Sequence, residues 1–571
     1  MGQGRGKADY KSVLKLIGER ISRAIAKPPA PTPPPLRAET PKSSVAQAAR
    51  PLSAGEERAR LPQASPVAQR PTPKPMSRKV ALRQRKKLRP PGAGSLRSTS
   101  ADPIDFGEFR EYRGVKPQRS NGDPASLKGD EALHYVKQHV SPREIRVDPG
   151  PPPRASSSTM AKTARTISLG AEVLRVRPEP DPLGFIVGFD FGTSSSKIVI
   201  HQPGAGDLAY ALPVPKELRA SDAGRSQDHL WRSTVWFEPK SQRFSLTPRS
   251  GWTPVEGFKT GLIQSSGHRM EIANITHAQA ATAYLALILT YLLGHHREAA
   301  PAGFKRKDHY SRVHFGVPVA CKDEQGCARE FRRVFDAAFR VAPFAAELDL
   351  EKVKAALAAA NPNQEETSEA PFVDFEELAA VIAGYRASPE KKVGPHMVVD
   401  VGASTLDVAT FYVPEDADEK VPVYMSGVDI LGADALAAAR RLGVPDATFQ
   451  AACGAHTRHV WSNTFLKRNS SFFPNNGVPK PMLFVGGGRL TDLHGPFYER
   501  YQNGLESPLR TPKPGRNLSY DKKTDVERLL LAWGLSQDQI EIPELRPPSQ
   551  VEEEVRRERD YTAGYVSKDM V

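Results

Sequence analysis

The chain has 571 residues, 39% of them hydrophobic and 25% charged, with 52 prolines and 3 cysteines. These totals are typical of a globular protein joined to a less ordered segment, and they exclude a collagen-like, a disulfide-stapled or a multi-span membrane protein. The formal net charge of +15 comes from residues 1–183, which contain 35 Lys and Arg against 17 Asp and Glu, whereas the rest of the chain contains 45 against 48.

Residues 1–183 are predicted to form a largely disordered, basic tail. They hold 26 of the 52 prolines, and proline lacks the backbone N–H that helices and sheets require. Apolar residues at three- and four-residue spacing nevertheless predict an amphipathic helix at residues 8–27, which ends before Pro28. Such a helix either orders on a protein partner or an anionic lipid surface, or remains solvated and half formed.

Two further segments of the tail suggest partners. Residues 58–101 contain 12 basic residues and no acidic one, with the densest run at 78–89. This run is expected to attract nucleic acid or anionic lipid without sequence preference, unless it is only a solvated tail. Residues 102–115 set apolar and aromatic side chains among acids, which is typical of a docking segment that folds on a protein partner.

The sequence also predicts a cytoplasmic protein without a transmembrane segment. Cys321, Cys327 and Cys453 form neither a paired framework nor a CxxC motif, and the N-terminus lacks a secretory signal pattern. The most apolar stretch, residues 280–293, includes two threonines and two tyrosines and falls short of the ~20 residues that a membrane span needs. It is therefore predicted to be a buried helix.

From residue 184 onward, apolar strands that end in glycine turns alternate with helical patterns, which predicts an α/β fold with two lobes. In FIVGFDFGTSSSKIVI, at 185–200, Asp190 closes a strand and Gly192, Thr193 and Ser194 form a turn. Such a hairpin offers a carboxylate to Mg²⁺, and backbone N–H groups and hydroxyls to phosphate oxygens.

Two more glycine turns follow. MVVDVGASTLDVATF, at 397–411, repeats the design of the first hairpin, and two such hairpins predict a duplicated fold with phosphates held between its halves. MLFVGGGRL, at 482–490, runs from a strand into three glycines. These would let a flat ring approach the backbone closely, with Arg489 available to stack on it.

The order and the sequences of these motifs resemble those of the superfamily of actin, sugar-kinase and heat-shock chaperone ATPases. The resemblance is strongest to the nucleotide-binding domain of the heat-shock protein 70 chaperones. Further resembling segments are VHFGVPVACKDEQGCAREFRRVF, FEELAAVIAGY, GVDILGADAL and LLLAWGLS. The resemblance implies a two-lobed actin-like ATPase fold of duplicated ribonuclease-H-like domains. Its implied parts are a first lobe at 184–400, a second lobe at 401–545 and a charged C-terminal segment at 546–571.

The resemblance further implies ATP or ADP and Mg²⁺ as ligands, and it assigns roles to individual residues. It places Asp190 and Asp407 on the Mg²⁺ side, Asp400 where it orients the attacking water, and Glu376 and Lys259 near the hydration sphere and the phosphates. The implied phosphate and adenosine contacts are Gly192, Thr193, Ser194, Gly402, Thr405, Gly486, Gly487, Gly488 and Arg489. For Glu376, Asp400 and Lys259, an ordinary surface or strand-end charge remains the alternative.

Three features depart from the family pattern. Ala403 and Ser404 stand where glycine is usual, so their Cβ atoms are expected to crowd the phosphate and to slow or abolish hydrolysis. The span from Leu431 to Leu483 is roughly half the usual one, which predicts a reduced outer subdomain and leaves the base preference open. After the fold closes, the remaining charged segment is expected to be too short for a peptide-binding domain.

These observations predict a slow Mg-dependent ATPase that acts as a nucleotide-controlled switch with a partner rather than as a peptide-holding chaperone. The main alternative is a degenerate, non-enzymatic scaffold that binds nucleic acid, anionic membrane or protein through its basic tail. A nucleotide-driven filament is a third hypothesis. A small-molecule kinase is least favoured, because the sequence shows no dedicated acceptor-sugar segment.

Overall fold

The computed structural model describes residues 124–141, 155–177, 179–204, 207–220, 228–263, 274–305, 307–318, 325–362, 370–467, 481–505, 509–520 and 525–551. Several predicted features lie outside these residues: the amphipathic helix at 8–27, the basic run at 78–89, the docking segment at 102–115 and most of the charged segment at 546–571.

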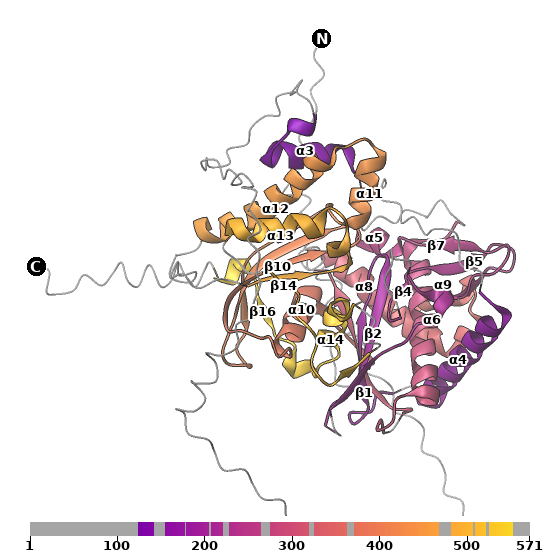
Figure 1. The fold of residues 1–571 in the computed structure, drawn as a ribbon. Coiled ribbons are helices and arrows are strands. Elements are labelled where there is room, and N and C mark those ends of the chain that lie inside the picture. The colour runs from indigo at the N-terminus through magenta and orange to yellow at the C-terminus, as the bar shows by residue number, and fades with distance from the viewer. Residues whose placement is uncertain are drawn as a thin grey trace, which may run out of the picture. The chain divides into compact units, whose positions relative to one another are not determined.

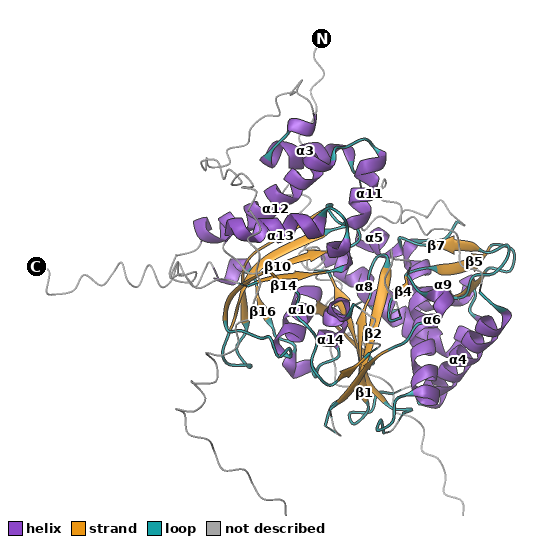
Figure 2. Cartoon of the chain, in the orientation of Figure 1, coloured by secondary structure: helices purple, strands orange, loops and turns teal. Residues whose placement is uncertain are grey.

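The described residues form an α/β structure with two mixed sheets, which confirms the predicted α/β class (Figures 1 and 2). The first sheet has the strand order β15-β3-β2-β1-β8-β9, with β4 beside β2, and the second has the order β14-β13-β10-β11-β12-β16. The strands of the first sheet are β1 (Phe185–Asp190), β2 (Ser195–Gln202), β3 (Leu208–Ala211), β4 (Trp231–Arg232), β8 (Tyr310–Val317), β9 (Phe372–Glu376) and β15 (Leu518–Ser519). Those of the second are β10 (Gly394–Val401), β11 (Leu406–Val413), β12 (Val421–Asp429), β13 (Met482–Val485), β14 (Leu509–Arg510) and β16 (Leu545–Arg546).

The two sheets repeat one pairing scheme. In the first sheet, β1 pairs antiparallel with β2, β2 antiparallel with β3, and β1 parallel with β8 on its other side. In the second, β10, β11, β12 and β13 pair in the same way and in the same directions. The two hairpins predicted from the sequence therefore occupy corresponding places in the two sheets.

Helices cover the sheets, and a small third sheet stands beside the first. The helices that pack with the first sheet include α5 (Phe258–Ile263), α6 (His277–Ala299), α8 (Gln325–Val341) and α9 (Leu350–Ala359). Those at the second include α11 (Ala433–Arg441), α12 (Asp446–Lys467) and α13 (His494–Leu505). The third sheet consists of β5 (Val235–Glu238), β6 (Arg243–Ser245) and β7 (Thr253–Val255).

Residues 280–293 lie inside α6 and are buried throughout, as predicted. In the part of the chain that the structure describes, no helix combines the length and the apolar character needed to cross a bilayer.

Two helices are exchanged between the sheets. Helix α10 (Glu377–Arg386) directly follows β9 of the first sheet, but its Leu378, Val381 and Ile382 pack in one core with strands of the second sheet. Helix α14 (Leu530–Leu535) follows five of the six strands of the second sheet along the chain, but its Ala532 and Trp533 pack on β2 and β3 of the first. Because α10 and α14 also contact each other, they join the two halves.

The prediction of disorder up to residue 183 is wrong for residues 157–176, which form helix α4 (Ser157–Val176). Its side chains at 167, 171 and 174 are buried at helical spacing, and the high proline content of the surrounding segment concealed this pattern. A Cβ atom at Gly170 would lie 1.8 Å from the carbonyl oxygen of Thr290. The backbones of α4 and α6 therefore cross in close contact, and α4 lies beside α6 at the edge of the first half (Figure 1), where Ile167 and Leu174 join its core.

The same prediction fails for helix α3 (Gly129–His139), which packs on α12 of the second half. Ala132 and Val136 are completely buried there. The Lys137 ammonium lies 2.6 Å from the Asp429 carboxylate at the end of β12. A segment far upstream in the chain therefore adds a helix to the outer part of the second half, where the sequence predicts a reduced subdomain.

Two smaller expectations also need correction. The predicted boundary between residues 400 and 401 falls inside β10, because the second sheet begins at Gly394. The spacing of the cysteines predicts no paired framework, yet Cys327 is disulfide-bonded, whereas Cys453 is free and buried.

We expect a chain that begins at residue 180 to aggregate, because it lacks α4 and α3 and so exposes the apolar surfaces that these helices cover. A chain that begins at residue 120 keeps both helices and should elute as a single soluble species in size-exclusion chromatography. A chain that begins at residue 155 separates the contribution of α4 from that of α3. Equal solubility and equal unfolding temperatures for all three chains would contradict the structural role of both helices.

Candidate functional site

A cavity of about 970 Å³ lies between the ends of the two hairpins. Its wall brings together twelve of the fourteen residues that the resemblance singles out, from four separate parts of the chain. These twelve are Asp190, Gly192, Thr193, Ser194, Lys259, Asp400, Gly402, Thr405, Asp407, Gly486, Gly487 and Gly488. The two predicted residues that do not border the cavity are Glu376 and Arg489.

Asp190 ends β1, and its carboxylate is buried against a lysine. In the antiparallel hairpin, Asp190 lies opposite Lys197 of β2, and the Lys197 ammonium is 2.9 Å from the carboxylate. Both side chains border the cavity. Lys197 is not among the predicted site residues, although the residue-by-residue pairing of the two hairpin strands places it opposite Asp190.

Asp400 and Asp407 face each other across the second hairpin, where they are direct neighbours in the register of β10 and β11. Burial raises the pKa of Asp400 to about 7, with Glu377 and Asp190 adding to the effect. Burial likewise raises the pKa of Asp407 to about 8, with Asp400 and Glu377 adding to it. The Thr405 hydroxyl donates a hydrogen bond of 2.9 Å to Asp407. The carboxyl groups of Asp400 and Asp407 therefore keep their protons near neutral pH unless a cation binds beside them.

Lys259 is another predicted residue that lies near these carboxylates, and its ion-pair partner is Glu377. The Lys259 ammonium on α5 lies 2.6 Å from the Glu377 carboxylate, and only 6% of the lysine side chain is exposed. Glu377 is the first residue of α10 and borders the cavity. The carboxylate that borders the cavity is therefore that of Glu377, one residue after the predicted Glu376. Strand β9 ends at Glu376, and the turn into the helix directs the next carboxylate toward the cavity.

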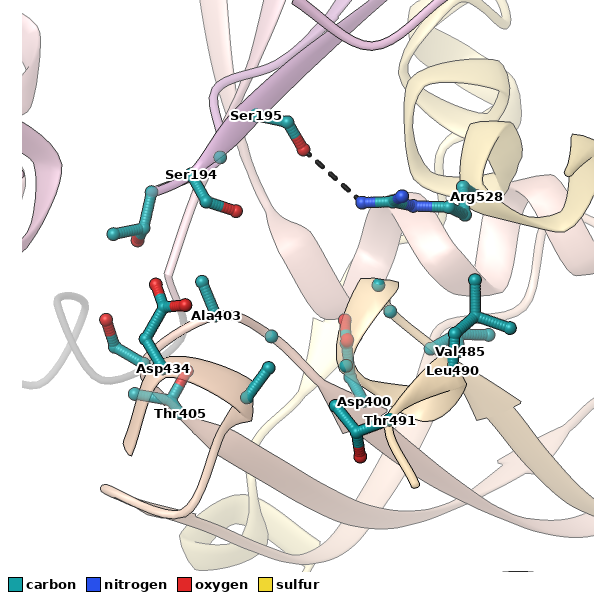
Figure 3. Close-up of a pocket in the computed structure, with 18 of the residues that line it drawn as sticks. Ser194, Ser195, Asp400, Ala403, Thr405, Asp434, Val485, Leu490, Thr491 and Arg528 are labelled. Carbon is teal, nitrogen blue, oxygen red and sulfur yellow. Dashed lines mark hydrogen bonds between the residues drawn. The ribbon is translucent and has the colours of Figure 1, made fainter. Parts of the chain in front are cut away.

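Arg489 follows the triple glycine but does not itself border the cavity. Its guanidinium lies 2.5 Å from Asp525 and 3.6 Å from Glu527, and Glu527 borders the cavity. Arg528 takes the cavity side instead. It lines the wall beside Gly487 and donates a hydrogen bond of 3.5 Å to the Ser195 hydroxyl of the first hairpin (Figure 3). Nothing in the sequence motifs indicated Arg528.

Two glycines on the cavity wall are required by the backbone. Gly486 has a φ of +84°, and a Cβ atom there would lie 2.2 Å from the Asp400 carboxylate oxygen. A Cβ atom at Gly192 would lie 2.1 Å from the Ser195 carbonyl oxygen. Larger residues at either position would displace the carboxylate or the hairpin turn.

Asp434, the second residue of α11, is a further cavity residue that the sequence analysis missed. Burial raises the pKa of its carboxyl group to about 6; Arg441 lowers the pKa and Glu256 of the first half raises it. Its side chain lies on the same side of the cavity as Ala403 and Thr405, across from Ser194 (Figure 3).

The cavity is polar and nearly balanced in charge. Its basic residues are Lys197, Arg232, Lys259, Arg440, Arg441 and Arg528, and its acidic residues are Asp190, Glu377, Asp400, Asp407, Asp434, Asp492 and Glu527. Among the described residues, no three His, Cys, Asp or Glu side chains gather in an arrangement that would hold a metal by themselves.

The chain was compared with protein-family models and with the sequences of curated proteins, and it matches none of them.

Proposed function

We propose that this chain is an actin-like, heat-shock protein 70-like ATP-binding protein that acts as a slow Mg-dependent ATPase and as a nucleotide-controlled switch. The observation that carries the proposal is that two hairpins of the same design, one from each sheet, border a single cavity. The repeated pairing scheme of the two sheets supports an origin by duplication. The cavity volume of about 970 Å³ is at the upper end of the range for small-molecule sites.

The residues of the cavity fit a magnesium-bound triphosphate. Mg²⁺ usually binds one or two carboxylates and completes its shell with water and substrate phosphates. Asp190 and Asp407 are carboxylates of that kind, and a dedicated cluster of three ligands is not required. Because the wall contains seven acidic residues against six basic ones, a triphosphate that carries its own cation suits it better than a bare polyanion.

The remaining roles follow from charge and position. Bound Mg-ATP supplies a γ-phosphate that is open to in-line attack by water. The ammonium groups of Lys197 and Lys259 stabilise negative charge on phosphate oxygens. Asp400, with its pKa near 7, is able to accept a proton from water at neutral pH. Binding that involves both hairpins favours the arrangement in which the two halves are close together, which gives the switch.

Calorimetric titration of the full chain with Mg-ATP and Mg-ADP tests the proposal. We expect saturable binding that Lys259→Met weakens at least about tenfold, because the variant removes a buried cation from the site. Lys354→Met, on the exposed face of α9, is the matched control and should leave binding unchanged. The absence of heat with any nucleoside triphosphate at about 1 mM would remove the proposal and leave the scaffold alternative.

A further inference from the structure

Ser404 carries a buried hydroxyl group without a partner in the protein. The residue is only 7% exposed, it borders the cavity, and its Oγ atom makes no hydrogen bond. A buried hydroxyl that lacks a partner destabilises the folded state, and polar groups of this kind are usually paired with protein, water or ligand. The Ser404 hydroxyl is therefore available to donate a hydrogen bond to a ligand in the cavity.

The turn that holds Ser404 is fixed by the N-terminus of α11. The carbonyl oxygens of Gly402, Ala403 and Ser404 accept hydrogen bonds of 3.1, 2.6 and 3.1 Å from the backbone N–H groups of residues 433, 434 and 432, respectively. In a planar trans peptide, the N–H group points opposite to the carbonyl of the preceding residue. The N–H groups of residues 403 to 405 therefore point away from α11, and the Ser404 side chain has a rigid base.

The position of Ser404 within the cavity indicates which part of a ligand it meets. It adjoins Thr405, whose hydroxyl binds Asp407, and Asp407 lies beside Asp400. Lys197 and Lys259 both lower the pKa of Asp400, so the two cations and the carboxylates share one region. The part of a ligand that belongs among these cations is the outermost and most highly charged phosphate.

We infer that the Ser404 hydroxyl donates a hydrogen bond to the terminal phosphate of a nucleoside triphosphate and so distinguishes triphosphate from diphosphate. This inference rests on the proposed function and adds the residue that senses the nucleotide state. The serine thereby contributes a donor that glycine, usual at this position in the resembling family, does not have. The side chain that is expected to crowd the phosphate instead binds it.

The test compares the full chain with its Ser404→Ala and Ser404→Gly variants, each titrated calorimetrically with Mg-ADP and with the non-hydrolysable β,γ-imido analogue of Mg-ATP. A hydrogen bond to a charged group contributes enough that its loss should weaken triphosphate binding by about tenfold or more. Binding of Mg-ADP should change less than about twofold. Ser388→Ala removes another buried hydroxyl, which accepts a hydrogen bond from the Glu390 backbone away from the cavity, and should not change the ratio.

Thermal unfolding without nucleotide gives an independent result. Because Ser404→Ala removes an unsatisfied buried group, it should unfold at the same or a higher temperature than the wild type. A lower unfolding temperature, or an equal loss of affinity for both nucleotides, would assign Ser404 a structural role and overturn the inference. An unchanged triphosphate-to-diphosphate ratio would overturn it while leaving the proposed function intact. Failure of the wild type to bind any nucleotide would overturn both.

Discussion

Replacement of Gly534 by alanine should destabilise the protein by about 3 kcal/mol or more, although alanine is normally favoured over glycine in a helix by ~1 kcal/mol. Gly534 lies in α14, where this helix meets α10. A Cβ atom there would lie 1.8 Å from the carbonyl oxygen of Ala380, and that neighbour is backbone rather than a flexible side chain. The two helices would have to separate, which would open the contact that joins the two halves.

Equilibrium unfolding in denaturant, followed by circular dichroism, measures this effect. Gly326→Ala is the matched control, because Gly326 also lies in a helix but a Cβ atom there has nothing within 4 Å. The control should be neutral or slightly stabilising. If Gly534→Ala proves as stable as Gly326→Ala, the close crossing of α10 and α14 is not present in solution.

The second large effect concerns pH. Asp407→Asn should stabilise the nucleotide-free protein relative to the wild type, and the gain should grow between about pH 5 and about pH 8.5. The pKa of Asp407 is raised from 3.8 to about 8 in the folded state. Above the unfolded pKa, the unfolded chain loses its proton first, so the wild type loses stability until the pH passes the folded pKa. Each pKa unit corresponds to about 1.4 kcal/mol, so we expect a gain of at least about 2 kcal/mol.

Chemical unfolding of both proteins at several pH values checks this prediction. Buried histidines with lowered pKa also affect stability in acid, but they contribute equally to both proteins and cancel in the difference. Asp446→Asn is a control of opposite sign, because a hydrogen bond from Arg440 lowers the pKa of that exposed carboxyl. Its small stabilising contribution is present above the unfolded pKa and is lost as the pH falls. A pH-independent difference for Asp407→Asn would show that the Asp407 carboxyl is not desolvated.

Much of the fold was predictable from local sequence, because strands and hairpins leave short periodic signals. The hairpins around Gly192 and Gly402 and the buried helix at residues 280–293 are examples. Helices α3 and α4 were not predicted. Their apolar positions are few, and only the surfaces of α12 and α6, which are distant in sequence, make them stable helices.

In the site, too, local sequence indicates the positions of some residues, whereas the positions of others depend on distant parts of the chain. The predicted residues of the two hairpins border the cavity, since the turn of each hairpin fixes their positions. Glu377 was missed by one residue, because the direction of its side chain depends on where β9 ends and α10 begins. Arg528 and Asp434 approach from other parts of the chain, and Arg489 is held by Asp525 and Glu527, so no motif indicates their orientation.

The exchange of α10 and α14 between the two sheets determines how the chain behaves when it is split into two pieces. If the gene were cut between the two sheets, each product would carry one helix with apolar residues that pack on the other product, and each would lack a helix that covers its own sheet. Neither piece should fold by itself, but the two pieces, expressed together, should find each other and reconstitute the whole. The chain is therefore suited to a split-protein complementation assay, with the break in the turn at residues 387–393 that precedes β10.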